Sequence, residues 1–301
     1  MGTLLAVWIG ILSSPAAPTA VVLGIAQDGG VPHAGCHQEL CVSARRDPSL
    51  RKRVASLGLV DPAANRRFLI DATPDFADQM ERLGGVPDGI LLTHAHIGHY
   101  LGLAQLGREV LDAKKVPVYA TARMARFLRE NRPWSRLVAM GNIEIREIEP
   151  HREFALTPRL SATAIRVPHR DADSDTDTVA YLVRGPGRKI LWLPDIDRWD
   201  RWDRRLADFL ADPETIVFVD GTFFSADEIP GRSLADIPHP LVPDTMSSLA
   251  AQPSARGRVF FIHLNHTNRL LWDDEAVRAI EAKGFAVARE GQTVSFTTTS
   301  P

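Results

Sequence analysis

An apolar run that ends in three closely spaced histidines constrains this chain more than any other feature. Residues 90–93 predict a buried strand, and His94, His96 and His99 follow it at once. Side chains two residues apart project to the same side of extended backbone, so His94 and His96 point together. Neutral imidazole is a ligand for zinc, iron, copper and nickel. Three of the ten histidines lie in this one turn, which favours a metal site over three unrelated surface residues.

Three later strand ends carry further candidate ligands. Apolar residues lead directly into His169, Asp195 and His263, so each polar side chain follows a buried strand. One such ending means little, because many strands end in Asp or His. Three of them, together with the histidine cluster, indicate a shared metal site built from imidazole and carboxylate groups.

Strand-like and helix-like segments alternate through both halves of the chain. Strands are predicted over residues 21–26, 67–71, 90–93, 116–120, 143–148, 160–167, 179–184, 189–194, 215–220, 258–264 and 286–296. Helices are predicted over residues 73–83, 100–111, 121–130, 198–210 and 273–283, the first with Thr73 as its cap and Pro74 at its first position. This alternation places helices outside sheets and predicts an α/β (α+β) fold.

The histidine cluster resembles the His-x-His-x-Asp-His signature of the metallo-β-lactamase superfamily, with Gly98 at the position of the aspartate. The resemblance implies an αββα sandwich of two mixed β-sheets with outer helices, formed by a single domain over residues 21–301. It also implies two metal sites, one held by His94, His96 and His169 and the other by His99, Asp195 and His263. Glycine supplies no ligand, so we expect one tight zinc ion and a second, weaker ion, with iron or manganese also compatible.

Two further segments resemble the pyrroloquinoline quinone biosynthesis protein B family. Residues 24–32, followed by Cys36 and Cys41, look like the opening of that family, and residues 261–268 look like its closing motif. The opening is also similar to that of a cyclic phosphodiesterase of phosphonate breakdown. The biosynthesis family keeps the Asp-His end of the metal motif and loses the leading histidines, whereas this chain keeps those histidines. That difference favours a hydrolase over a role in quinone synthesis.

The activity expected from these features is metal-dependent hydrolysis of a small molecule. Three imidazoles leave the fourth position of zinc open for water, and zinc lowers the pKa of that water to about 7. The zinc-bound hydroxide would act on a phosphodiester, a lactone or another ester, with Asp195 and His266 as catalytic candidates. The alternatives are a metal-dependent oxidoreductase related to the quinone-biosynthesis family and a non-catalytic binding protein with a degenerate site.

Composition and the N-terminal segment limit the binding partners and the cellular location that we expect for this protein. The 35 Lys and Arg residues are balanced by 37 Asp and Glu residues, so there is no basic excess for nucleic acid. Residues 1–20, apolar and then rich in Ser, Ala and Pro, predict a signal peptide that lacks a basic start. Its apolar run is too short to span a bilayer. We therefore expect a periplasmic or secreted protein, and the sequence does not indicate its oligomeric state.

Several other polar residues fit two interpretations. Asp71 and Asp75 flank a predicted helix start and suit either helix capping or support of a metal ligand. Asp220 ends a strand and either shapes a turn or faces the site. The remaining histidines are expected at the surface, and these are His33, His37, His151 and His239.

Cys36 and Cys41 are the only cysteines. They suit a disulfide in an exported protein, a structural zinc site with His33 or His37, or free thiols. Specificity is expected to lie in two loops over the metal edge, residues 171–177, which are strongly acidic, and residues 223–243.

Overall fold

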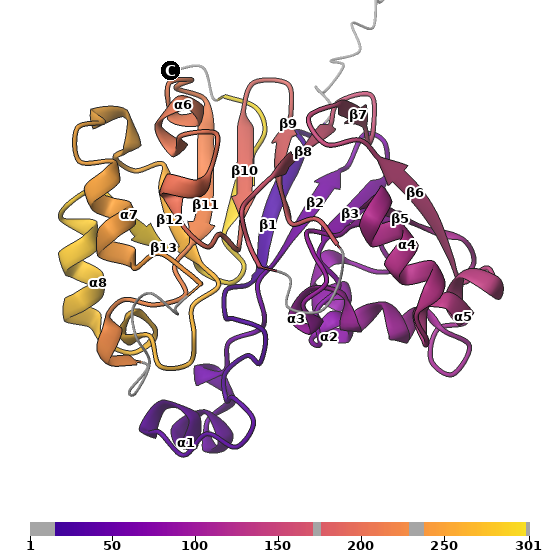
Figure 1. Cartoon of the computed structure of the whole chain (residues 1–301), viewed down its shortest axis with the longest axis horizontal. Helices are drawn as coiled ribbons and strands as arrows, with labels where there is room; N and C mark the ends of the chain where they lie inside the picture. Colours follow the sequence, from indigo (N-terminus) through magenta and orange to yellow (C-terminus); the bar gives the residue numbers. More distant parts are fainter. Residues whose placement is uncertain (1–15, 171–175, 229–237, 299–301) are drawn as a thin grey trace, which may run out of the picture.

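The computed structural model describes residues 16–170, 176–228 and 238–298. They form two seven-stranded sheets packed face to face, with helices on the two outer sides (Figure 1). The expected αββα sandwich of two mixed sheets is therefore confirmed. A search of these residues finds no helix with the length and apolar character needed to cross a membrane. Most of the predicted signal peptide lies outside the described residues, and its assignment stays a prediction.

The first sheet has the strand order β14-β1-β2-β3-β4-β5-β6. Strands β3 to β6 run parallel, while β14, β1, β2 and β3 pair antiparallel to their neighbours. Its strands are β1 (Thr19–Gly24), β2 (Ser56–Asp61), β3 (Arg66–Ile70), β4 (Gly89–Leu91), β5 (Val116–Thr121), β6 (Ile143–Ile148) and β14 (Thr293–Ser295). Its outer face is covered by α2 (Phe76–Leu83), α3 (Ile97–Tyr100), α4 (Ala122–Glu130) and α5 (Trp134–Ala139).

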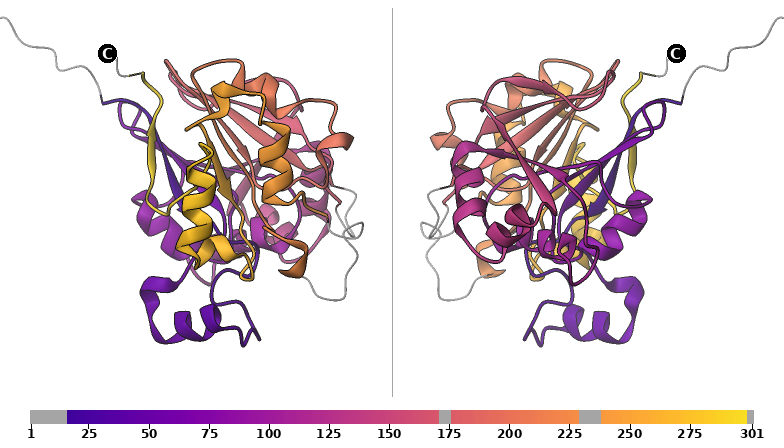
Figure 2. Two further views of the ribbon diagram at one scale, coloured as in Figure 1. Left: turned by 90° about the vertical axis from the view of Figure 1, so that its left-hand side faces the viewer. Right: turned by 90° about the vertical axis from the view of Figure 1, so that its right-hand side faces the viewer.

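The second sheet has the order β13-β12-β11-β10-β9-β8-β7. Strands β10 to β13 are parallel, and β7 to β10 are antiparallel. Its strands are β7 (Glu153–Ala155), β8 (Ser161–Arg166), β9 (Val179–Arg184), β10 (Lys189–Leu193), β11 (Thr215–Asp220), β12 (Val259–Ile262) and β13 (Ala286–Val287). Helices α6 (Leu206–Leu210), α7 (Val242–Ser248) and α8 (Asp274–Glu281) pack on its outer face. Helix α1 (Glu39–Arg46) projects from one end of the sandwich (Figures 1 and 2).

Alternation of side chains along the strands separates two apolar cores. On β3, Phe68 and Ile70 join the core between the sheets, whereas Leu69 joins the core beneath α2 to α5. Strand β10 is buried on both faces, and Leu191 and Trp192 are fully buried within it. Central parallel strands covered on both faces read as continuous apolar runs, which explains the composition of β10.

Four sequence predictions of local structure are corrected. The helix expected over residues 100–111 is a 3₁₀ helix over Leu101–Leu106 that follows the short α3. The helix expected from Thr73 begins at Phe76, because the Thr73 hydroxyl accepts from the backbone N–H of Asp75 in a turn before it. The helix expected over 198–210 is α-helical only in α6, with a short 3₁₀ turn before it. The strand expected over 286–296 is two strands, β13 and β14, which belong to different sheets. Gly291, with φ +82°, turns the chain between them.

Strand direction brings the predicted ligands to one edge of the sandwich. In the first sheet β1 and β4 point the same way, because two antiparallel pairings separate β1 from β3. In the second sheet β8, β10, β11 and β12 share a direction for the same reason. The residues that follow these six strands meet at their carboxyl ends, where side chains of both sheets converge.

Tyr181 on β9 ties the second sheet to the residues that precede the histidine cluster. Its buried hydroxyl donates to the carbonyl oxygen of Leu92 at 2.9 Å. Replacing Tyr181 with Phe should lower the free energy of unfolding by about 1–2 kcal/mol, because the buried carbonyl loses its partner. Urea unfolding measures this loss. Tyr119→Phe, at a half-buried ring stacked on Phe154, is the control and should change stability by less than about 0.5 kcal/mol. Equal effects would contradict the assignment.

Candidate metal centre

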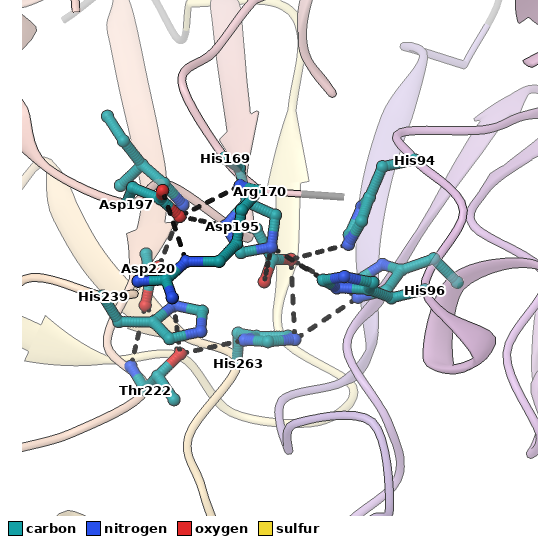
Figure 3. A network of polar contacts seen from close by, with 12 residues as sticks. His94, His96, His169, Arg170, Asp195, Asp197, Asp220, Thr222, His239 and His263 are labelled. Atoms are coloured by element: carbon teal, nitrogen blue, oxygen red, sulfur yellow. Dashed lines mark hydrogen bonds and ion pairs between the residues drawn. The ribbon is translucent and has the colours of Figure 1, made fainter. Parts of the chain in front are cut away.

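Six of the residues predicted as metal ligands meet between the two sheets (Figure 3). The first sheet supplies three of them after β4, and the second sheet supplies three after β8, β10 and β12. They are His94, His96, His99, His169, Asp195 and His263. Four of the six are buried, with no exposed surface at His94, His99 and His263, and His96 and His169 are partly buried. The structure thus brings the whole predicted set together.

One group of potential ligands consists of His94, His96, His169 and Asp195. The Nε2 atom of His169 lies 3.4 Å from Nδ1 of His96 and 3.6 Å from Oδ1 of Asp195. The other carboxylate oxygen of Asp195, Oδ2, is 3.9 Å from Nε2 of His94. These residues match the expected first site, with Asp195 at its border.

A second group contains His99, His263 and a residue that the sequence had not indicated, Asp28. The Nε2 atoms of the two imidazoles are 3.3 Å apart. Oδ1 of Asp28 lies 3.3 Å from His99 and 3.8 Å from His263. Oδ2 of Asp195 is 3.3 Å and 3.5 Å from the same two nitrogens. A second carboxylate, Asp28, therefore lies at this group, where the sequence predicted Asp195 alone.

The spacing of these atoms suits a metal ion. Ligand atoms about 2.1 Å from a tetrahedral zinc ion lie roughly 3.4 Å from one another, close to most of the separations above. Among the described residues, Nε2 of His94, Oδ1 of Asp28 and Oδ2 of Asp195 are buried without a hydrogen-bond partner. Buried polar atoms without partners are costly, so the converging orphan atoms fit positions that a cation would satisfy.

Contacts on the far side of three rings set their orientation. Nδ1 of His99 is hydrogen-bonded to Oδ2 of Asp71 at 2.8 Å, and Nδ1 of His263 to the Thr222 hydroxyl at 3.0 Å. Nδ1 of His169 lies within ion-pair distance of Oδ1 of Asp197, at 3.0 Å, without hydrogen-bond geometry. Partners of this kind fix the ring and direct the other nitrogen toward the ion. Asp71, buried and also bonded to Thr93, therefore supports a ligand, whereas Asp75 binds the backbone of Val54.

Charge is unevenly distributed over the buried imidazoles. Burial, followed by repulsion from His99, lowers the pKa of His94 well below its ordinary value. Burial also opposes the charged form of His99, yet the neighbouring Asp71 and Asp195 raise its pKa well above the ordinary value. Burial alone would raise the pKa of Asp195, but the surrounding imidazoles, His263 foremost, lower it. Asp195 is therefore an anion throughout the neutral range.

His239 and Asp220 form a charged pair beside the ligands. His239 was expected at the surface, but the structure buries it, and its Nδ1 lies 2.7 Å from Oδ2 of Asp220. The backbone N–H of Val242 donates to the carbonyl of Phe223, which anchors the chain just after His239. His239 also forms a third potential ligand group with Asp195 and His263. Its sequence context, a lone histidine between two prolines, gave no signal of this role.

The other candidates lie outside these groups. His266 stacks on His33, with ring centroids 4.2 Å apart, and its catalytic role stays a prediction. His37 and His151 are exposed, as expected. Cys36 and Cys41 are free thiols rather than a disulfide.

The part of the chain that the structure describes places no cysteine in a potential metal group. Of the two predicted specificity loops, residues 171–175 and 229–237 lie outside the described ranges.

The position of Asp28 just after a strand is a local signal in the sequence. Asp28 stands in the glycine-containing turn that follows the buried strand β1, so it has the same strand-end position as the other candidate ligands. The aspartates that orient the rings, Asp71, Asp197 and Asp220, also follow or end strands. Spacing alone does not distinguish them from turn residues, because only tertiary contacts show which rings they face.

The fold and this edge of the sandwich define a metal-binding protein of the αββα class. Residues 66–264 match the family model of the beta-lactamase superfamily domain, so the chain belongs to that superfamily. The expected resemblance is confirmed.

Similar proteins share most of their length with this chain. Coenzyme PQQ synthesis protein B of Methylobacterium sp. (strain 4-46) is 26% identical over 92% of this chain and 99% of its own length. The corresponding protein of Rhizobium meliloti (strain 1021) is 28% identical over 91% and 96%. The crystal structure of Zn²⁺-bound PqqB from Methylobacterium extorquens superposes with a TM-score of 0.75, at 25% identity, over 92% and 99%. A diphosphatase of the PhnP family has the same fold, with a TM-score of 0.67 at 23% identity over 93% and 98%.

The pKa differences predict that the two groups load metal with different pH dependence. Ligands must be deprotonated to bind, so an ion entering beside His99 displaces a proton, whereas His94 is already neutral. As the pH falls, affinity at the Asp28, His99 and His263 group should therefore decrease before affinity at the His94 group. Zinc occupancy measured across pH 5–8 against a competing chelator tests this order. Loss of both ions in parallel would contradict it.

Proposed function

We propose that this protein is a metal-dependent hydrolase that uses a zinc-bound hydroxide to cleave a phosphodiester, a lactone or another ester. One observation carries the proposal: two groups of imidazole and carboxylate atoms converge beside a shared aspartate, Asp195, and three of the converging atoms lack a hydrogen-bond partner among the described residues. Superfamily membership supports metal binding at this edge. The zinc named for a solved relative supports zinc as the ion.

Zinc at this edge would supply a nucleophile at neutral pH by lowering the pKa of a bound water to about 7. The chain's own residues would then position and protonate the reacting groups. Asp195 lies within 4 Å of four imidazoles, so its carboxylate would help to hold the metal and would accept a hydrogen bond from the attacking water. Its lowered pKa keeps it in the accepting form.

His239 is placed to protonate the leaving group. Burial opposes its charged form, but Asp220 raises its pKa above the ordinary value and so favours the protonated imidazole. Its ring lies 5.3 Å from that of His169 and 6.0 Å from that of His263, at the border of the ligand set. In such a hydrolysis a bond would form between the attacking oxygen and phosphorus or carbonyl carbon, the bond from that atom to the leaving oxygen would break, and the leaving oxygen would take the proton of His239.

A metal-dependent oxidoreductase is the second candidate. Likeness to coenzyme PQQ synthesis protein B over nine-tenths of the chain supports it. The two functions differ in metal and cosubstrate. Iron in the purified protein, with turnover that consumes oxygen, would support oxidation, whereas zinc with oxygen-independent turnover supports hydrolysis.

Replacing His169 with Ala should remove one metal ion and the hydrolytic activity together, because the first group loses one of its three imidazoles. Metal analysis and a panel of phosphodiesters, lactones and β-lactams measure the two losses. His151→Ala, at an exposed histidine, is the matched control and should retain both. Full metal content in the His169 variant would exclude this residue as a ligand, and a wild-type protein that hydrolyses no ester would contradict the proposed function.

Replacing His239 with Gln should reduce kcat by about 10²- to 10⁴-fold through loss of the proton donor. The loss should be much smaller for an ester with a 4-nitrophenolate leaving group, which needs little protonation, than for an alkyl ester. Zinc content should stay unchanged. A fall in zinc content would instead assign His239 as a ligand, and an equal loss for both leaving groups would remove the proton-donor role.

A further inference from the structure

The second ligand group has no carboxylate at position 98 of the histidine motif, but a turn that is distant in the sequence supplies one. Gly98 lies between His96 and His99, where it offers no ligand atom. Asp28, in the turn after β1, places Oδ1 at 3.3 Å from Nε2 of His99. The two residues are in direct contact, because a Cβ built on Gly98 would lie 2.0 Å from Oδ1 of Asp28.

The same contact explains why position 98 is glycine. A Cβ there would also lie 2.6 Å from the Cα of Asp28, which is backbone and has no alternative rotamer. Any larger residue at position 98 would therefore push the turn away from the site. The φ of Gly98 is not in the left-handed region, so close approach rather than backbone conformation requires the glycine.

The turn that carries Asp28 is held by backbone pairing to the strand end that carries His263. The N–H of Gln27 donates to the carbonyl of Leu264 at 2.9 Å, and the N–H of Leu264 donates to Ile25 at 2.8 Å. Asp28 is therefore fixed relative to His263 by the residues next to each. Its side chain is one-third exposed, yet Oδ1 itself is buried and lacks a hydrogen-bond partner among the described residues.

We propose that Asp28 is a ligand of the second metal ion and takes the place of the carboxylate that Gly98 removes. The ion would be held by Asp28, His99 and His263, and Asp195 lies between these residues and the first group. Carboxylate and imidazole are ligands for zinc, manganese and ferrous iron, so the donor set suits a divalent cation. The proposal rests on the proposed metal centre and deepens it, since it assigns both ions full ligand sets.

Zinc binding to the full-length protein tests this assignment without any substrate. Zinc per chain and the affinity of each ion would be measured against chelators of graded strength, with cobalt substitution as a spectroscopic check. Asp28→Asn keeps the size of the side chain and should weaken only the second ion, by about 10- to 100-fold, because one interaction with a charged group is lost. Asp75→Asn, at a neighbouring aspartate that binds backbone, should retain both wild-type affinities.

Gly98→Ala gives an independent test, since it adds no ligand and should expel Asp28 by contact. It should weaken the second ion as much as Asp28→Asn does, and the double variant should be no weaker than Asp28→Asn alone, because both changes remove one interaction. Far-UV circular dichroism and Tm would show whether each variant folds. Asp28→Asn decides the matter if Gly98→Ala unfolds.

Wild-type affinity for both ions in Asp28→Asn would overturn the proposal, as would additive losses in the double variant. A wild-type chain that binds only one ion yet hydrolyses an ester would also overturn it while the proposed function stands. The selective loss of the second ion in a protein that hydrolyses nothing would support Asp28 as a ligand and reject the hydrolase.

Discussion

The gathering of buried imidazoles around one carboxylate is the interaction on which this structure depends. Rings from both sheets are packed at one edge, and four of them face the carboxylate of Asp195 within 4 Å. Without that anion and without a bound cation, the buried imidazole nitrogens would have left water and would lack partners within the protein. Further carboxylates surround the cluster, since each of Asp71, Asp197 and Asp220 faces the outer nitrogen of one ring. Carboxylates therefore lie on the outer side of these histidines, and the opposite ring nitrogens point toward the centre of the cluster.

The sandwich makes this arrangement possible because it needs no long loops to assemble the site. Strands of both sheets deliver polar residues within a few positions of their last paired residue. Tyr181 and Val179 bind the carbonyls of Leu92 and Thr93, so the second sheet fixes the backbone from which the histidine cluster starts. Ring positions are therefore set by sheet packing, which is far stiffer than a surface loop.

Much of the fold and most of the ligand set could be predicted from the sequence, because strand ends are local signals. His169 and Asp195 follow apolar runs directly, and the structure places both at the site. The sequence did not predict Asp28 and His239 as site residues, because their positions beside the site depend on contacts between segments far apart in the chain. Residues 286–296 read as one strand, since pattern alone does not show that their two halves pair with opposite sheets.

The backbone pairing of Gln27 with Leu264 has a consequence for chain topology. These residues stand near opposite ends of the sequence, and the side chains beside them, Asp28 and His263, face one another across 3.8 Å. A cation shared by these two groups would act as a cross-link that closes a loop containing most of the polypeptide. Closing so long a loop restricts the unfolded chain more than the folded one. A metal ion bound in this way would stabilise the folded chain against unfolding. Stability and catalytic activity would then both depend on the availability of that ion.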